Sequence, residues 1–406
     1  MWGVINMVKN KVMNRWIVVI GALIVQICLG AIYAWSVFVN PLKERGFTTT
    51  QTQIIFSVAL ATFALVMIFA GRWQDKAGPR KVAITGGIVL GLGYILAGIT
   101  GGSFWAIVLT VGFIAGAGIG LGYVCPIAAG VKWFPDKRGL ITGLAVAGFG
   151  GGAWIISQVA SSLIIKVGVL QTFLYLGIAF LVAVVIGSLV LVNPPEGWKP
   201  KGWTADNKTQ KACKNDCAWK EMLKTKQFWL LWVMFIFSAT SGLMVIGILK
   251  PFGVVSGLSA AIAGSAVGIL ALFNAAGRIT WGWLSDKVGR TKAMFIMFLL
   301  QGIVMLALIK MGSTALTLAI AAAWIGFNFG GNFALFPSAT ADFFGTKNLG
   351  INYGFVFTSY GVAGIIGPIL GGKVFDLTGS YLWAFIPAGV LCLIASLLSF
   401  FTKNPE

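Results

Sequence analysis

The sequence predicts an all-α membrane protein with 12 transmembrane helices in two six-helix bundles. Hydrophobic residues make up 58% of the 406 positions and charged residues only 10%, and the mean hydropathy is +0.90. Because a soluble domain carries roughly 25% charged residues, lipid must be the solvent for most of this chain. The 54 glycines fit this environment, since small residues let helices pack closely in a bilayer.

Twelve apolar stretches are long enough to cross a bilayer as helices, for which about 20 mainly apolar residues suffice. They lie at about 16–39, 52–71, 83–101, 105–130, 140–165, 171–192, 228–250, 261–284, 293–310, 314–337, 352–372 and 381–401. Strands of a membrane barrel would be shorter and would alternate apolar with polar residues, and these stretches do neither.

A polar, lysine-rich segment separates the first six stretches from the last six. We therefore expect an N-terminal six-helix bundle over 1–192, a basic cytoplasmic linker over 193–227 and a C-terminal six-helix bundle over 228–406. With the N-terminus inside, most basic residues share the side of this linker, as the positive-inside rule requires. The net charge of +19 therefore indicates a multi-pass protein of the inner or plasma membrane, with both termini cytoplasmic, and no nucleic-acid partner.

The residue types needed for a metal centre or for catalysis are scarce. The chain has five cysteines and no histidine, whereas tetrahedral zinc requires four ligands. Cys213 and Cys217 lie in the predicted linker, where a reducing cytosol disfavours a disulfide. All 11 acidic residues fall in loops or at the ends of the apolar stretches. We expect no metal, no cofactor and no enzymatic activity.

One loop motif occurs twice, after the second and after the eighth apolar stretch, and both copies read G-x-x-x-D-K-x-G-x-x-K. Its residues are Gly71, Asp75, Lys76, Gly78 and Arg80 in the first loop and Gly282, Asp286, Lys287, Gly289 and Arg290 in the second. The glycines allow a tight turn, and the carboxylate is expected to cap the next helix or to pair with basic groups. The loops are either cationic anchors that fix the topology or a charge-relay latch that accompanies movement of one bundle.

This duplicated loop resembles the signature of the major facilitator superfamily, and the resemblance covers almost the whole chain. It implies two six-helix bundles around a central cavity that opens alternately to either side of the membrane. We therefore expect a transporter that works by alternating access.

Arg278 is the one clear charge inside a predicted span. An arginine without an acidic neighbour favours an anion, because its planar fork matches a carboxylate and stays charged. Asn274 lies one turn earlier on the same face of the helix and makes that face polar towards the midplane. The alternative is that Arg278 snorkels to water, since it lies about 6–9 Å from the cytoplasmic end of its span by helical rise.

Further polar and aromatic residues lie at intramembrane depths in other spans. They are Tyr33, Tyr123, Asn328, Asn332, Phe333, Phe357 and Tyr360. Near Tyr123, Pro126 is expected to loosen the helix. Taken singly, a buried Tyr or Asn is explained equally well by a bond to a neighbouring helix. Taken together with Arg278, they describe a small cavity with one cation, several donors and aromatic walls, which suits a small organic monoanion.

Four segments resemble the oxalate/formate antiporter family, which is related to the monocarboxylate (lactate and pyruvate) transporters. They lie at 133–139, 227–232, 334–337 and 352–355. The resemblance implies that the cavity arginine of the family is Arg278. It also implies that the cavity aromatics of the family are Tyr33, Tyr123, Phe333 and Phe357.

Two departures from these families narrow the expected substrate. Where the oxalate exchanger has a second cation, a lysine, this chain has Tyr360, and a second carboxylate left unpaired there would cost several kcal/mol. Where the animal monocarboxylate transporters have an aspartate implicated in proton coupling, this chain has Asn274. We therefore expect a monomeric, proton-coupled symporter of small monocarboxylates of the L-lactate or pyruvate type, with the proton carried on the substrate. The alternatives are a proton-independent carboxylate exchanger and a sensor that binds without transport.

Overall fold

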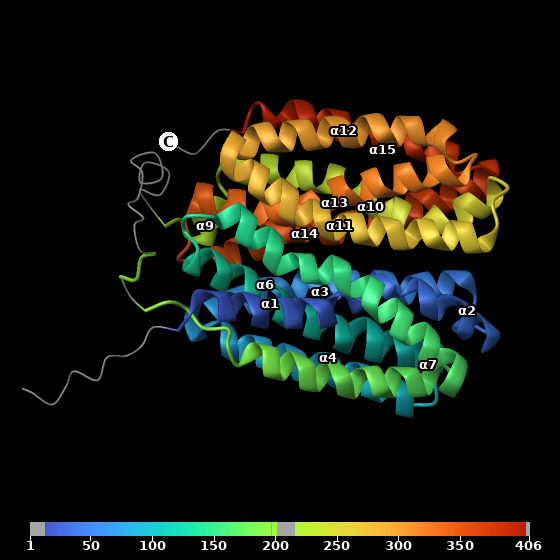
Figure 1. The fold of residues 1–406 in the computed structure, drawn as a ribbon, viewed down its shortest axis with the longest axis horizontal. Helices are drawn as coiled ribbons and strands as arrows, with labels where there is room; N and C mark the ends of the chain where they lie inside the picture. The colour runs from blue at the N-terminus through green and yellow to red at the C-terminus, as the bar shows by residue number, and fades with distance from the viewer. Residues whose placement is uncertain (1–12, 196, 201–215, 403–406) are drawn as a thin grey trace, which may run out of the picture.

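The chain is helical and forms two bundles that lie side by side (Figure 1). The fold is that of a computed structural model, which describes residues 13–195, 197–200 and 216–402. The first bundle contains α1 (Arg15–Leu29), the 3₁₀ segment η1 (Gly30–Ala34), α2 (Ser36–Glu44), α3 (Thr49–Ala77), α4 (Pro79–Ile99), α5 (Phe104–Ile107), the π-helical segment η2 (Val108–Ala115), α6 (Gly116–Trp133) and α7 (Arg138–Ser188). The second bundle contains α10 (Lys226–Val255), α11 (Ala260–Val288), α12 (Arg290–Met311), α13 (Ala315–Phe344), α14 (Leu349–Thr378) and α15 (Leu382–Ser399), preceded by the short helix α9 (Trp219–Met222).

Eleven helices within the described residues are long and apolar enough to cross a membrane. One of them, α7, has 51 residues and contains a kink at Gly168, where φ is +81°. A glycine reaches this positive φ at little cost, and the kink divides α7 into the fifth and sixth crossings. The predicted all-α architecture of 12 crossings in two bundles of six is therefore confirmed, and the chain is a multi-pass membrane protein.

Two crossings are less regular than their hydropathy predicts. The first is bent, because α1 passes through η1 before α2 begins. In the fourth, α6 continues through Pro126 without a break, although the proline removes one helical hydrogen bond. The irregular turn of this crossing is the wider segment η2 instead.

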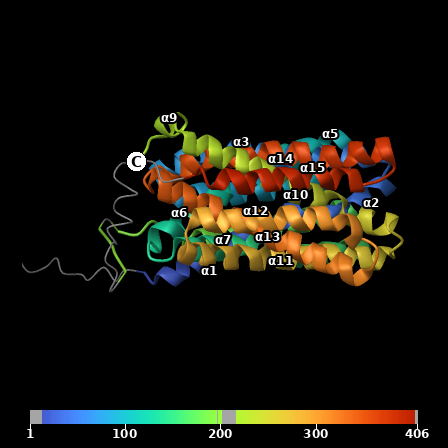
Figure 2. The same ribbon diagram turned by 90° about the horizontal axis from the view of Figure 1, so that it is seen from above.

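The start of α1, the linker and the end of α15 lie at the same end of the molecule, which we call the linker end (Figure 1). Figure 2 shows the same arrangement after a quarter turn. We call the opposite end, where α2 lies, the far end. Of the predicted linker, residues 196 and 201–215 lie outside the described residues, and Cys213 is among them.

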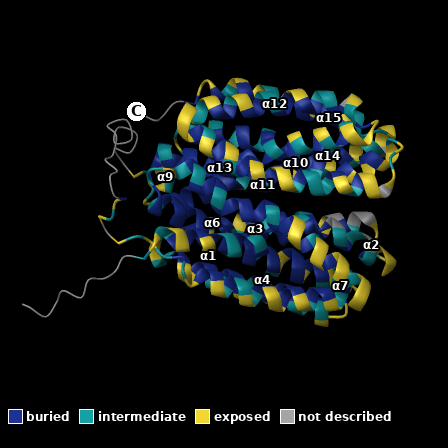
Figure 3. Ribbon diagram, viewed as in Figure 1, coloured by how far each residue is buried: buried dark blue, intermediate teal, exposed yellow. Residues whose placement is uncertain are grey.

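Large apolar side chains cover the outside of both bundles, where exposed residues alternate with buried ones along each helix (Figure 3). Ile165 is 85% exposed, Leu377 84% and Trp105 74%. In water such a surface would drive aggregation, whereas in a bilayer it faces acyl chains. The exposed apolar surface therefore agrees with a lipid-embedded protein.

The two bundles touch most closely at the linker end, through pairs of glycines. A Cβ atom at Gly71 would lie 2.1 Å from the carbonyl oxygen of Gly350, and one at Gly282 would lie 2.2 Å from that of Gly139. Along the α7–α11 interface the approach loosens towards the far end, where a Cβ atom at Gly268 would meet Trp154 at 3.9 Å. The helices are thus tightly packed at the linker end and diverge towards the far end.

Candidate substrate site

Arg278 lies at the interface between the two bundles and is fully buried. Helix α11 continues for ten residues beyond it, to Val288, which corresponds to about 15 Å of helix. The predicted span ended at 284, and the snorkelling alternative depended on that short distance. Because the guanidinium is fully buried and does not reach solvent, the snorkelling alternative is wrong.

Three groups hold the Arg278 side chain, two from its own bundle and one from the first bundle. Its Nε donates to Oδ1 of Asn274 at 2.8 Å, and its Nη1 donates to the backbone oxygen of Val146 on α7 at 2.8 Å. The guanidinium also lies over the ring of Phe333, 4.2 Å from its centroid. Since the side chain is attached to one bundle and donates to the other, its position depends on both.

Three polar atoms near the guanidinium lack a hydrogen-bond partner among the described residues. They are Nη2 of Arg278 and the hydroxyl oxygens of Tyr123 and Tyr353. Tyr123 lies close to the side chains of both Arg278 and Tyr353. A buried polar group without a partner costs roughly 1–3 kcal/mol, so this cluster favours a ligand that accepts hydrogen bonds.

The hydroxyl oxygens of Tyr33 and Tyr360 are 2.5 Å apart and join the two bundles. Tyr33 belongs to η1 and Tyr360 to α14, and both interact electrostatically with Arg278. Tyr33 also contributes to a cavity of about 30 Å³ between the bundles, which exceeds the volume that one water molecule requires. The other lining residues are Gly150, Ala153, Ile246, Leu249, Val267, Leu270, Ala271 and Asn274.

This cavity lies on the far-end side of Arg278. The residues that α7 contributes to the lining follow Val146 towards the far end, and those that α11 contributes precede Arg278. Apart from Tyr33 and Asn274, the lining consists of apolar side chains and one glycine. The structure therefore combines a closed linker end with a cavity that leads from Arg278 towards the far end.

The predicted aromatic residues converge on this site. Phe333 lies 5.5 Å from Tyr360, Phe357 lies 4.8 Å from Tyr360, and Tyr123 lies 5.2 Å from Phe357, measured between ring centroids. With Tyr33, these side chains form one cluster around the guanidinium. The structure thus brings together seven of the nine predicted site residues, counting Arg278 and Asn274.

Asn328 and Asn332 do not join this cluster. Asn332 accepts a hydrogen bond from the Ser238 hydroxyl at 3.0 Å, and it therefore faces α10 inside the second bundle. Asn328 lies one turn earlier on the same face of α13. Adjacent helical positions point about 100° apart, and in α13 it is Phe333, the neighbour of Asn332, that faces Arg278. The side-chain oxygen of Asn332 thus points towards Ser238 and not towards the guanidinium, whereas both polar side-chain atoms of Asn328 are buried without a hydrogen-bond partner among the described residues. That the two amides line the central cavity stays a prediction.

Three residues of the site were missed from the sequence. Phe149 lies 5.4 Å from the guanidinium carbon of Arg278, Phe63 lies 5.1 Å from Tyr123, and Tyr353 carries the unpaired hydroxyl. Phe149 had a detectable signal, because it is the one large side chain in the glycine-rich run 147–152. Nothing in the sequence distinguishes Phe63 from the other phenylalanines, of which the chain has 30 in total.

The carboxylates of the duplicated loops bind helix starts in the opposite bundle. Asp75 accepts hydrogen bonds from the backbone N–H groups of Gly350 and Ile351 at 3.0 and 2.9 Å, and we call this contact the first latch. Asp286 accepts from Gly139 and Leu140 at 3.0 and 2.9 Å, and this contact is the second latch. A carboxylate at a helix N-terminus satisfies free N–H groups and complements the helix dipole.

The expectation that each carboxylate caps the helix that follows its loop was wrong, since Asp75 and Asp286 cap helices of the other bundle. The alternative of pairing with basic groups holds for Asp286, which lies 2.7 Å from Arg290. Gly78 and Gly289 make the expected turns, with φ of +82° and +91°.

Ion pairs reinforce the second latch. Asp342 on α13 pairs with Arg290 at 2.7 Å and with Arg138 of the first bundle at 3.0 Å. Lys287 is exposed and lies over the Trp283 ring. The two remaining basic residues of the motif, Lys76 and Arg80, are exposed. The charged residues at the linker end thus form two groups: some form ion pairs between the bundles, and the others are exposed.

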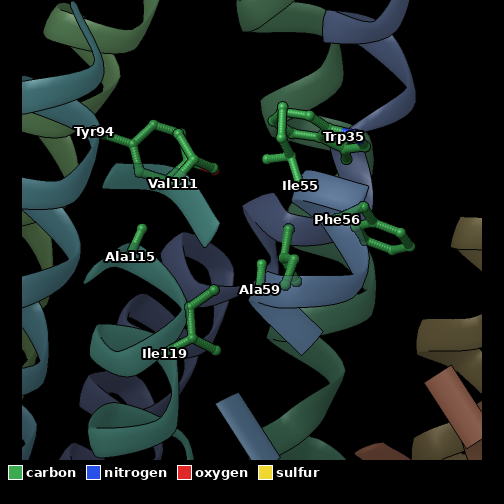
Figure 4. A pocket seen from close by; sticks show the side chains of 9 residues that line it. Trp35, Ile55, Phe56, Ala59, Tyr94, Val111, Ala115 and Ile119 are labelled. Atoms are coloured by element: carbon green, nitrogen blue, oxygen red, sulfur yellow. The ribbon is translucent and has the colours of Figure 1, made fainter. Parts of the chain in front are cut away.

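A second cavity lies inside the first bundle and is apolar (Figure 4). Its volume is about 10 Å³, and its lining residues include Trp35, Tyr94 and Val111. Arg278 is the only charged side chain among the buried residues that the structure describes. Within the same residues no group of three or more Cys, Asp and Glu side chains could hold a metal ion. The Arg278 cluster is therefore the candidate substrate site.

The sequence matches the family model of the Major Facilitator Superfamily over residues 16–279 and 242–406. It is 31% identical to the oxalate:formate antiporter of Oxalobacter formigenes, over 96% of this chain and 91% of that protein. It is 26% identical to monocarboxylate transporter 12 of Xenopus laevis, over 96% of this chain and 90% of that protein. Among solved structures, the MFS proton:xylose symporter XylE has the same fold, with a TM-score of 0.74 and 13% identity over 96% of each chain. The resemblance expected from the duplicated loop and the four shorter segments is confirmed, and the chain belongs to the major facilitator superfamily.

Proposed function

We propose that this transporter carries small monocarboxylates of the L-lactate or pyruvate type by alternating access. The observation that carries the proposal is the unpaired Nη2 of Arg278, buried beside the unpaired hydroxyl of Tyr123. A carboxylate accepts hydrogen bonds from both donors and balances the charge of the guanidinium. Asn274 and Val146 occupy Nε and Nη1, so the arginine stays oriented while the substrate enters and leaves.

The charge of the site favours one carboxylate over two. Arg278 is the only charged side chain that is buried within the described residues, and the position where the oxalate exchanger has a lysine holds Tyr360. A second carboxylate would lose its hydration without gaining a counter-ion, at a cost of several kcal/mol. The aromatic walls of Phe149, Phe333 and Phe357 suit the short carbon skeleton of a monocarboxylate.

We assign the linker end to the cytoplasm of an inner or plasma membrane, because the basic residues gather there. The described state is then closed to the cytoplasm by the two latches, and its cavity leads outwards. In this assignment the duplicated loops act as latches that break when the linker end opens. Asn332, which accepts from Ser238 of α10, would support the second bundle rather than touch the substrate.

Transport measured in proteoliposomes distinguishes the two modes of coupling. The membrane part of the site offers no carboxylate or histidine among its described residues, so we propose that the proton travels on the substrate as the carboxylic acid. Uptake of radiolabelled L-lactate is expected to rise with an inward-acid pH gradient, without any counter-anion inside. Uptake that requires an internal carboxylate and ignores the pH gradient would establish the alternative, anion exchange. Ligand binding in detergent without flux would instead indicate a sensor.

Replacing Tyr123 by Phe tests the second donor of the site. Tyr123→Phe keeps the ring but removes the hydroxyl, and the KM for L-lactate is expected to rise about ten-fold, the value of one hydrogen bond to a charged group. The matched control is Tyr94→Phe, which removes a buried hydroxyl from the other cavity and is expected to change the KM less than two-fold. Equal KM values in Tyr123→Phe and the unchanged protein would remove Tyr123 from the site.

A further inference from the structure

The end of the linker folds back onto the second bundle and binds the turn between α13 and α14. The N–H of Cys217 donates to the oxygen of Phe344 at 3.1 Å, and the N–H of Lys347 donates to Oδ1 of Asp216 at 3.1 Å. The side-chain amides of Asn348 and Asn352 both donate to the oxygen of Cys217, at 3.2 and 3.1 Å. We call residues 216–222 the strap.

The second part of the strap is anchored by packing. Trp219 stacks on Phe355 of α14, with ring centroids 5.2 Å apart and an angle of 16° between the rings. Met222 is fully buried, and the Glu221 side chain accepts from the N–H of Ala218 at 3.0 Å, which closes the first turn of α9. The strap therefore has a defined conformation and holds α14 through both backbone and side-chain contacts.

The strap reaches the same turn of α14 that Asp75 binds. Asp75 takes the N–H groups of Gly350 and Ile351, while the strap holds Asn348 and Asn352 on either side of them. Lys132, at the end of α6 in the first bundle, lies close enough to Asp75 and Asp216 for its positive charge to attract both carboxylates, without a direct ion pair to either within the described residues. The charge of one lysine thus acts on both the first latch and the strap.

The two latches differ in what supports them. The second latch is supported by the ion pairs of Arg290 and Arg138 with Asp342. In the first loop, the position that corresponds to Arg290 is Pro79, which offers no charge. The first latch therefore lacks reinforcement by an arginine. The strap and Lys132 lie beside the first latch, where such an arginine would act.

We infer that the strap is the positioning element of the first latch: it fixes the start of α14 where Asp75 can bind it, and Lys132 links the Asp216 carboxylate to the first bundle. The strap is then part of the closure at the linker end and not only part of a tether between the bundles. This inference rests on the proposed alternating access, but not on the identity of the substrate.

Two substitutions of Asp216 separate its charge from its hydrogen bond. Asp216→Asn removes the charge that faces Lys132 but keeps an oxygen for the N–H of Lys347, and it is expected to lower L-lactate uptake about three-fold. Asp216→Ala removes both, and the expected loss is about ten-fold. Lys132→Ala also loses the attraction to Asp75 and is expected to lower uptake at least three-fold. The double variant, Lys132→Ala with Asp216→Asn, is expected to be no worse than Lys132→Ala alone, because the interaction between Lys132 and Asp216 is already lost. The control is Asp136→Asn, whose carboxylate pairs with Arg15 inside the first bundle and whose uptake should stay within two-fold.

Hydrogen–deuterium exchange of the full-length protein distinguishes a positioning role from a local structural role. If the strap positions the latch, Asp216→Ala raises amide exchange at 345–352 and also at 139–143, the part of α7 that closes against α11. A rise confined to 345–352, or unchanged uptake in Asp216→Ala, would overturn the inference. Exchange is read without substrate, so a protein that carries no L-lactate would contradict the proposed function while still testing the strap.

Discussion

Replacing Arg278 by Ala is expected to lower L-lactate uptake by about 100-fold or more. The substrate carboxylate would then enter a buried aromatic site without a counter-ion, at a cost of about 3–5 kcal/mol, and 1.4 kcal/mol corresponds to a factor of ten. The side chain also joins the bundles through Val146. The measurement is the initial rate of uptake into proteoliposomes under an inward-acid pH gradient.

Two further variants separate charge from geometry. Arg278→Lys keeps the charge but loses the planar fork that binds Asn274 and Val146 at once, and uptake is expected to fall about ten-fold. Arg80→Ala removes an exposed arginine and is expected to change uptake less than two-fold. Uptake in Arg278→Ala that equals that of the unchanged protein would show that the substrate binds elsewhere.

Hydropathy was sufficient to predict the fold because the bilayer imposes a length and an apolar composition on each crossing. It was less accurate where a helix leaves the membrane. Helix α11 continues through Ser285, Asp286 and Lys287 to Val288, since polar residues end a hydrophobic stretch without ending a helix. The full burial of Arg278, and with it the rejection of snorkelling, required the structure.

The direction of a side chain was the harder part of the site to predict. In a soluble protein the polar face of a helix indicates solvent, but in a bilayer both faces of a crossing are apolar. Asn332 and Phe333 lie at the same depth, yet one faces Ser238 and the other faces Arg278. Depth alone therefore does not predict which of two neighbouring side chains points towards Arg278.

The sequence motif also could not predict which groups are in contact at the linker end. The motif identified Asp75 and Asp286, but not the helix starts that they bind, because these lie about 150 to 275 residues away along the chain and meet only when the bundles pack. The same is true of Asp342, which no motif marked and which joins both bundles through Arg290 and Arg138.

Replacing Asp286 by Ala is expected to open the linker end. The variant loses the acceptor for two N–H groups of α7 and the partner of Arg290, and charge-assisted hydrogen bonds contribute about 1.5–3 kcal/mol each. The equilibrium should therefore move from the closed towards the open linker end by about 10- to 100-fold. Amide exchange at 139–143 should rise, and L-lactate uptake should fall about ten-fold, because the state that receives substrate from the far end is less populated.

Asp136→Ala is the matched control for this prediction, because Asp136 is also a partly exposed aspartate at the linker end that pairs with an arginine. Its pair with Arg15 lies within one bundle, so it contributes nothing to the contact between the bundles, and its uptake should stay within two-fold. If the loops were only cationic anchors, Asp286→Ala and Asp136→Ala would behave alike, since neither removes a positive charge. A latch requires instead that exchange also rises at 349–352, where Asp75 binds, because two contacts that close the same interface open together.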